Sequence, residues 1–117
     1  KRQMLNHVVL LKFKPGVAEG DIEKLEELMD DLPNKISEIL VYEFGRNTIP
    51  SERAYDFALV SLFANPESLE RYRQHPDHLE VLDLITDISE TIITADFLGS
   101  DASAIKEKTP DMGLSDF

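Results

Sequence analysis

The chain has 117 residues, of which 42% are hydrophobic, so it can form one domain with a core and is not compositionally disordered. Its net charge of -11 argues against binding to nucleic acid or to an anionic membrane surface, which needs clustered Lys and Arg. The absence of cysteine excludes disulfides, thiolate catalysis and thiolate metal sites. No apolar run has membrane-spanning length and no signal peptide is visible, so we expect a cytoplasmic location.

The first part of the chain predicts two strands with a helix between them. Residues 7–13 are rich in β-forming side chains, and Pro15 follows as a turn signal. From about residue 20, apolar side chains recur at helical spacing with acidic residues between them. We expect this helix to stop at Pro33, because proline removes a backbone donor. A second strand is predicted over residues 39–46.

A third strand, predicted over residues 55–63, leads into a strong helix start. Asn65 followed by Pro66 is typical of an N-cap residue with proline at the first helical position. Glu67 and Arg71 are four residues apart in this helix, so we expect them to form an ion pair on its exposed side.

Pro76 divides the second helical region into two helices. The residue before a proline is disfavoured in helical conformation, so one helix should end near His75. Proline suits the first turn of a helix, so the next should begin at Pro76. The apolar stripe expected on this last helix consists of Leu79, Leu82 and Ile85.

The chain closes with a fourth strand, predicted over residues 91–98, and a polar, aperiodic segment, 99–117, which we interpret as a C-terminal tail. The domain itself is then residues 1–98. The order βαββαβ suits a four-stranded antiparallel sheet with the helices on one face. The first and third strands are apolar on both faces, although helices can cover only one. We therefore expect a second copy of the chain to cover the other face, in a homodimer.

Two of the three histidines and a tyrosine lie in the segment 70–78, which makes it the candidate site. His78 falls in the first turn of a helix, where the helix dipole disfavours imidazolium. One interpretation is structural, with His75 ending one helix and Tyr72 packing its ring. A second makes His78 a general base and Tyr72 a hydrogen-bond donor to a developing enolate oxygen.

A third interpretation is metal binding through His75 and His78, with His7 or Asp77 as a further ligand. Pro76 breaks the single helix face on which paired histidine ligands usually lie, so we predict no metal site. The sequence also has no phosphate-binding glycine loop, nucleophile elbow or paired-carboxylate motif, and no motif for haem or flavin. We expect no cofactor.

Several segments in order resemble the stress-responsive dimeric A/B barrel (Dabb) family. The resemblance covers about residues 4–98 and implies a ferredoxin-like α+β unit that dimerises through its sheet into a dimeric α+β barrel. It is carried by the segment 7–14, the Asn65-Pro66 helix start, the pattern Tyr72-x-x-His75-Pro76-x-His78 and the segment 92–97.

The resemblance also implies a pocket. One plant member, olivetolic acid cyclase, is a cofactor-free polyketide cyclase that closes a ring by aldol condensation. Its pocket tyrosine and its histidine base match Tyr72 and His78, and another pocket histidine matches His7. Phe57 stands where the cyclase has a further histidine, so this pocket has fewer polar groups and suits a more apolar ligand.

These observations predict a cofactor-free homodimer of the stress-responsive A/B barrel type, in which each subunit has a small, mostly apolar ligand pocket. The residues expected to line it are His7, Phe57, Tyr72 and His78. On this interpretation the specific activity is unassigned. The alternative is a lyase- or cyclase-type enzyme that acts on a small carbonyl or aromatic compound, with His78 as general base and Tyr72 as hydrogen-bond donor.

Overall fold

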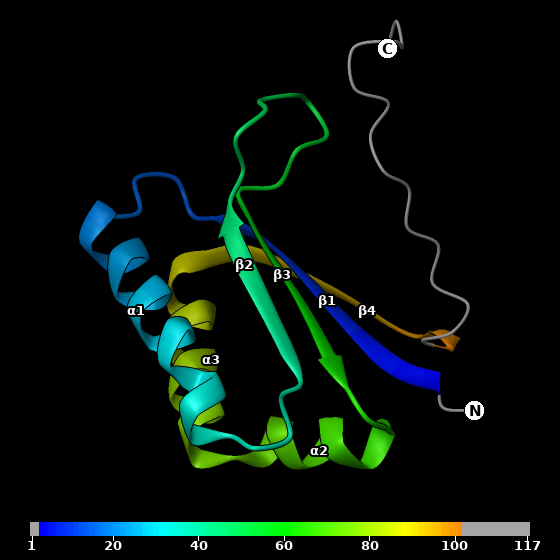
Figure 1. Ribbon diagram of the computed structural model, residues 1–117. Coiled ribbons are helices and arrows are strands. Elements are labelled where there is room, and N and C mark those ends of the chain that lie inside the picture. Colours follow the sequence, from blue (N-terminus) through cyan, green and yellow to red (C-terminus); the bar gives the residue numbers. More distant parts are fainter. Residues whose placement is uncertain (1–2, 102–117) are drawn as a thin grey trace, which may run out of the picture.

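The computed structural model describes residues 3–101 as an antiparallel sheet with helices on one side of it (Figure 1). The segment expected as a tail lies, from residue 102 onward, outside the described residues. The elements are β1 (Gln3–Phe13), α1 (Glu19–Lys35), β2 (Val41–Arg46), β3 (Phe57–Phe63), α2 (Pro66–Gln74), α3 (Pro76–Ile88) and β4 (Ser89–Asp101). β4 continues three residues past the predicted strand end at Leu98. Among the described residues, no helix is both long and apolar enough to cross a membrane.

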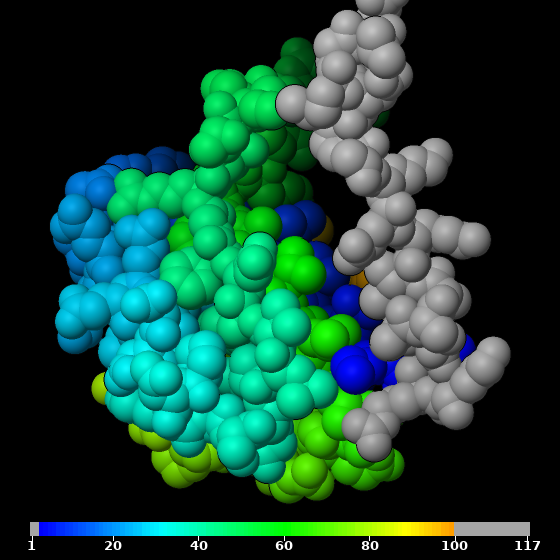
Figure 2. Space-filling model, viewed as in Figure 1, coloured from blue at the N-terminus to red at the C-terminus, as the bar shows by residue number. Residues whose placement is uncertain are grey.

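The four strands lie in the order β2-β3-β1-β4, and every neighbouring pair is antiparallel. α1 and α3 cover one face of this sheet, whereas α2 lies across its end, where β3 finishes (Figure 1). The connection between β2 and β3 projects at the opposite end of the molecule (Figures 1 and 2). The predicted α+β, ferredoxin-like arrangement is confirmed.

The core lies between the sheet and the helices. Alternation along β1 and β3 turns every second side chain towards α1 and α3, as period-two patterning requires. From the strands, this core buries Leu5, Leu11, Phe57, Leu59 and Phe63. From α1, α2 and α3 it buries Leu25, Met29, Leu32, Leu69, Tyr72, Val81, Ile85 and Ile88.

The opposite face of the sheet is also apolar, as the sequence predicts, and no helix among the described residues covers it (Figure 1). The strand register places Val60, Val8 and Ala95 side by side across β3, β1 and β4. Nearby, Ile93 is 41% and Phe97 is 52% exposed. Exposed apolar area of this kind is typical of an interaction surface.

Pro33 does not stop α1, which continues to Lys35, so that prediction is wrong. A proline this close to a helix end removes only one backbone hydrogen bond. The last turn is held instead by the Ile36 N–H, which donates to the Leu32 carbonyl at 2.9 Å. Leu32 and Ile36 are both buried, so their packing fixes the turn that the proline would disfavour.

The start of α2 is confirmed, because the Asn65 side chain accepts a hydrogen bond from the Ser68 N–H at 2.8 Å. The expected surface pair is wrong. Arg71 bonds the carboxylate of Glu38 at 3.0 Å instead of Glu67, because the segment after α1 comes within its reach. Arg71 also donates to the Ser68 hydroxyl at 3.1 Å.

α3 begins at Pro76, as predicted, but its buried stripe is offset from the predicted one. Only Ile85 of the expected residues is buried, and the stripe comprises Val81, Ile85 and Ile88. Leu79 is 45% exposed and Leu82 is 37% exposed. The predicted and the observed stripe each have the spacing of one helical face. The direction from which α1 and the sheet pack against α3 determines which of the two stripes is buried.

Candidate functional site

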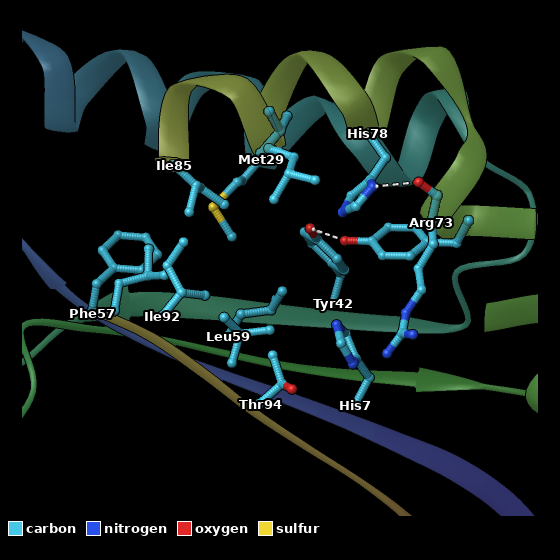
Figure 3. A pocket seen from close by; sticks show the side chains of 15 residues that line it. His7, Met29, Tyr42, Phe57, Leu59, Arg73, His78, Ile85, Ile92 and Thr94 are labelled. Carbon is cyan, nitrogen blue, oxygen red and sulfur yellow. Dashed lines mark hydrogen bonds between the residues drawn. The ribbon is translucent and has the colours of Figure 1, made fainter. Parts of the chain in front are cut away.

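A cavity of about 370 Å³ lies between the sheet and the helices (Figure 3). That volume falls in the range of small-molecule sites, roughly 300–1,000 Å³. All four residues that the sequence singles out line it: His7, Phe57, Tyr72 and His78. Side chains from all four strands and all three helices contribute to the wall.

The two ends of the cavity differ in chemistry (Figure 3). The apolar end is formed by Met29, Phe57, Ile85 and Ile92. The polar end is formed by His7, Tyr42, Arg73 and His78. A bound molecule that satisfied both ends would have an apolar body and an oxygen- or nitrogen-containing head.

His78 is held in one tautomer by the backbone of α2. α3 begins two residues earlier, so His78 lies in its first turn, and its Nδ1 is 3.1 Å from the Arg73 carbonyl oxygen. A carbonyl can only accept, so Nδ1 carries the hydrogen and Nε2 keeps a free lone pair in the neutral ring. Within residues 3–101 Nε2 forms no hydrogen bond.

The pKa of His78 is lowered, chiefly because burial disfavours the charged imidazolium. Its hydrogen bond to the Arg73 carbonyl acts in the opposite direction, and the nearby charge of Arg73 adds to the lowering. At neutral pH the ring is therefore uncharged. A neutral imidazole with a free lone pair on the cavity side is a suitable proton acceptor.

Two tyrosines form a hydroxyl pair beside His78. The Tyr42 and Tyr72 oxygens are 2.9 Å apart, and either can donate to the other. Burial raises the pKa of Tyr72 to about 12 and that of Tyr42 further still, so both stay protonated. Two hydroxyls share one hydrogen bond here, which leaves one O–H free to donate to a ligand.

His7 is bound at the other side of Tyr72. Its Nδ1 hydrogen-bonds Oδ1 of Asp96, which lies opposite His7 in the register of β1 and β4. Arg73 Nη2 donates to the other carboxylate oxygen of Asp96 at 2.8 Å. The ring of Tyr72 lies between the two histidines, 6.1 Å from the His7 ring and 4.2 Å from the His78 ring.

His75 does not belong to this cluster. Its Nδ1 accepts a hydrogen bond from the Asp77 N–H at 3.1 Å, so the side chain caps the start of α3. The structural interpretation is therefore right for His75, whereas His78 and Tyr72 face the cavity. In the part of the chain that the structure describes, no three His, Cys, Asp or Glu side chains are grouped to hold a metal ion.

Three polar residues of the site were not anticipated from the sequence: Tyr42, Arg73 and Asp96. Tyr42 has the alternation of an inward-facing strand residue, but its partner lies 30 positions later. Asp96 interrupts an apolar strand, and such an interruption signals a carboxylate that needs a partner. The sequence alone does not reveal that β1 is the neighbouring strand that supplies this partner.

Known proteins are similar to this chain in sequence or in fold. An uncharacterised protein of Streptomyces coelicolor is 32% identical over 77 residues, which cover 64% of this chain and 79% of the relative. A dimeric ferredoxin-like protein of unknown function from Bacteroides fragilis is 29% identical, with a TM-score of 0.74 over 82% of this chain and 96% of that one.

Hydroxynitrile lyase from Passiflora edulis has a TM-score of 0.76, over 94% of this chain and 100% of its own. At 19% identity, this likeness concerns the fold alone. The model of the stress-responsive A/B barrel domain matches residues 5–98, which include all three helices, β2, β3 and most of β1 and β4. This chain therefore belongs to the stress-responsive A/B barrel domain family.

Proposed function

We propose that the protein is a cofactor-independent enzyme of the lyase or cyclase type, acting on a small carbonyl compound with an apolar body. The observation that carries this proposal is the state of His78: an uncharged ring with its hydrogen fixed on Nδ1 and its Nε2 lone pair free. A histidine serving only to stabilise the fold needs no unpaired ring nitrogen at a cavity.

The proposed reaction begins with proton abstraction next to a carbonyl group. His78 Nε2 takes the proton from the α-carbon, and negative charge develops on the carbonyl oxygen. The free O–H of the Tyr42–Tyr72 pair stabilises that oxygen by a hydrogen bond, which is strong in a site shielded from water. The resulting enolate is the nucleophile of an aldol-type ring closure.

The two-ended cavity supports the choice of substrate class. A carbonyl head fits among Tyr42, Tyr72 and His78, while a hydrocarbon body fits against Phe57 and Ile85. The hydroxynitrile lyase of Passiflora edulis is an enzyme with the same fold, so the fold is compatible with catalysis.

The exchange of α-carbon hydrogens in 2-heptanone for deuterium in D₂O, followed by NMR, tests this proposal. The probe has one carbonyl and a short apolar chain, matching the two ends of the cavity. We expect exchange above the buffer rate, and a loss of about 100-fold or more in His78→Gln, the range of general-base catalysis. The control is His75→Asn, which keeps a capping side chain at α3. Wild-type exchange no faster than buffer would contradict the proposal.

We also propose that the protein works as a homodimer joined through the open sheet face. The face is apolar around Val8, Val60 and Ala95, and within residues 3–101 no helix covers it. The structurally similar Bacteroides fragilis protein is itself dimeric. Burying this face in a dimer removes apolar surface from water, which stabilises the dimer by roughly 25 cal/mol for each Å² buried.

A further inference from the structure

A second histidine, His7, faces the same cavity, and the proposed proton abstraction does not use it. The residue is only 5% exposed, and its Nδ1 is bound to Asp96. Nε2 forms no hydrogen bond within residues 3–101. Among the described residues, the Ser89 hydroxyl is the only side-chain polar atom that is both shielded from solvent and without a hydrogen-bond partner. Nε2 of His7 also has no partner, so it is not shielded from solvent, and it reaches the cavity that His7 lines.

Asp96 holds His7 in this orientation. Its Oδ1 accepts from the His7 ring and its Oδ2 accepts from Arg73, so both carboxylate oxygens hold side chains of the site. A carboxylate has no hydrogen to give, so the hydrogen of this bond is on His7 Nδ1. Any proton that His7 exchanges with a ligand therefore passes through Nε2, as in other carboxylate–histidine pairs.

The surroundings of His7 have both signs of charge. The titratable groups that face it are Asp96 from β4, Arg73 and Tyr72 from α2, Tyr42 from β2 and His78 from α3. β3 contributes the uncharged Phe63 ring, 6.2 Å from His7, and the Ser61 hydroxyl, which donates to the His7 carbonyl.

We infer that His7 is the proton donor of this site and that Asp96 is its positioning residue. This rests on the proposed function, in which His78 is the base on the other side of Tyr72. The substrate class is an enolisable ketone whose carbonyl oxygen lies near His7 and whose α-carbon lies near His78.

The step is balanced. The α-carbon–hydrogen bond breaks, its proton goes to His78 Nε2, and its electron pair forms the carbon–carbon double bond of the enol. The carbonyl oxygen takes the proton from His7 Nε2, so His7 becomes neutral as His78 becomes imidazolium. The reverse transfers restore both rings after the reaction.

The Tyr42–Tyr72 pair is poorly suited to this donation. Burial raises the pKa of Tyr72 to about 12, so it releases its proton reluctantly near pH 7. An efficient general acid releases its proton readily at the working pH, which a hydroxyl with a pKa of about 12 does not. The tyrosine pair hydrogen-bonds the oxygen, and His7 supplies the proton.

The rate–pH profile of 2-heptanone deuterium exchange tests this inference. Wild type should show a rising limb from His78 and also a falling limb, because a general acid works only in its protonated form. His7→Gln should lose the falling limb and about 100-fold in rate. Asp96→Asn should keep more activity but move the falling limb to lower pH, because asparagine has no charge to stabilise imidazolium. The matched control is Asp87→Asn, an exposed position on α3.

Each result decides a different point. If wild type exchanges the ketone but His7→Gln keeps its falling limb and stays within roughly twofold in rate, the inference is wrong and the proposed function stands. An unmoved falling limb in Asp96→Asn likewise overturns the positioning role, without relying on the folding of the His7 variant. No exchange by wild type overturns both.

Discussion

The Nδ1–H of His78 donates to the backbone carbonyl of Arg73, and this one bond decides which ring nitrogen faces the cavity. The bond spans the junction of α2 and α3, where Pro76 ends one helix and starts the next. The break in the helix therefore has a chemical consequence. It leaves a carbonyl of α2 free to fix the tautomer of a histidine in α3.

The depressed pKa of His78 makes folding stability depend on pH. The unfolded ring has its ordinary pKa of about 6.5, so below that value the unfolded state binds the proton more readily. Stability from this source is complete above pH 6.5 and is lost as pH falls towards the lower folded pKa. Urea unfolding should show a larger loss between pH 7.5 and 5.5 in wild type than in His78→Gln. Equal losses would contradict burial as the cause.

The Tyr42–Tyr72 hydroxyl pair should couple in a double-mutant cycle. Tyr42→Phe or Tyr72→Phe alone leaves one buried hydroxyl without its partner, at a cost of about 1–2 kcal/mol. The double variant removes both groups and should cost less than the sum of the two single changes. Denaturant unfolding of the four proteins measures this, and strict additivity would show that the pair does not interact.

The open sheet face should determine the oligomeric state. Val60→Glu introduces a carboxylate in the centre of that face, next to Val8, and should convert a dimer to a monomer in light scattering coupled to size-exclusion chromatography. Leu79→Glu is the matched control, because Leu79 on α3 is 45% exposed and Val60 is 47% exposed. A monomeric wild type at micromolar concentration would refute the proposed homodimer.

The N-cap at Asn65 should stabilise α2 and hence the position of Tyr72 and Arg73. Asn65→Ala removes the acceptor for the Ser68 N–H and should lower the free energy of unfolding by about 1 kcal/mol. Asn65→Asp retains an acceptor oxygen and should lose much less. Similar losses in both variants would mean that the cap hydrogen bond contributes little.

Strand alternation made much of the fold predictable from the sequence. Val8 and Val9 placed apolar groups on opposite faces of the sheet, and Asn65 with Pro66 placed the start of α2. The predictions for Pro33 and Leu79 were wrong because they followed local helix preference and residue spacing. Tertiary packing, which the sequence does not display, decides both positions. Leu32 and Ile36 hold the turn around Pro33 through their burial and through the hydrogen bond from the Ile36 N–H to the Leu32 carbonyl.

Residue patterns alone predicted the site only where one segment carried it, whereas His7 and Phe57 were expected there from the family resemblance. Tyr72 and His78 lie six positions apart, and their pattern pointed to a common pocket, which the structure places between sheet and helices. Tyr42 and Asp96 enter through strand pairing and helix packing, 30 and 89 residues from their partners Tyr72 and His7. No spacing rule connects residues so far apart in the chain.

The most direct test of the account is the protonation state of His78 at pH 7, read from the nitrogen chemical shifts of its ring by NMR. We expect a neutral ring with hydrogen on Nδ1 and a free lone pair on Nε2. His78→Gln identifies the signal by its disappearance. A charged ring, or a neutral ring with its hydrogen on Nε2, would contradict the assignment of His78 as the base.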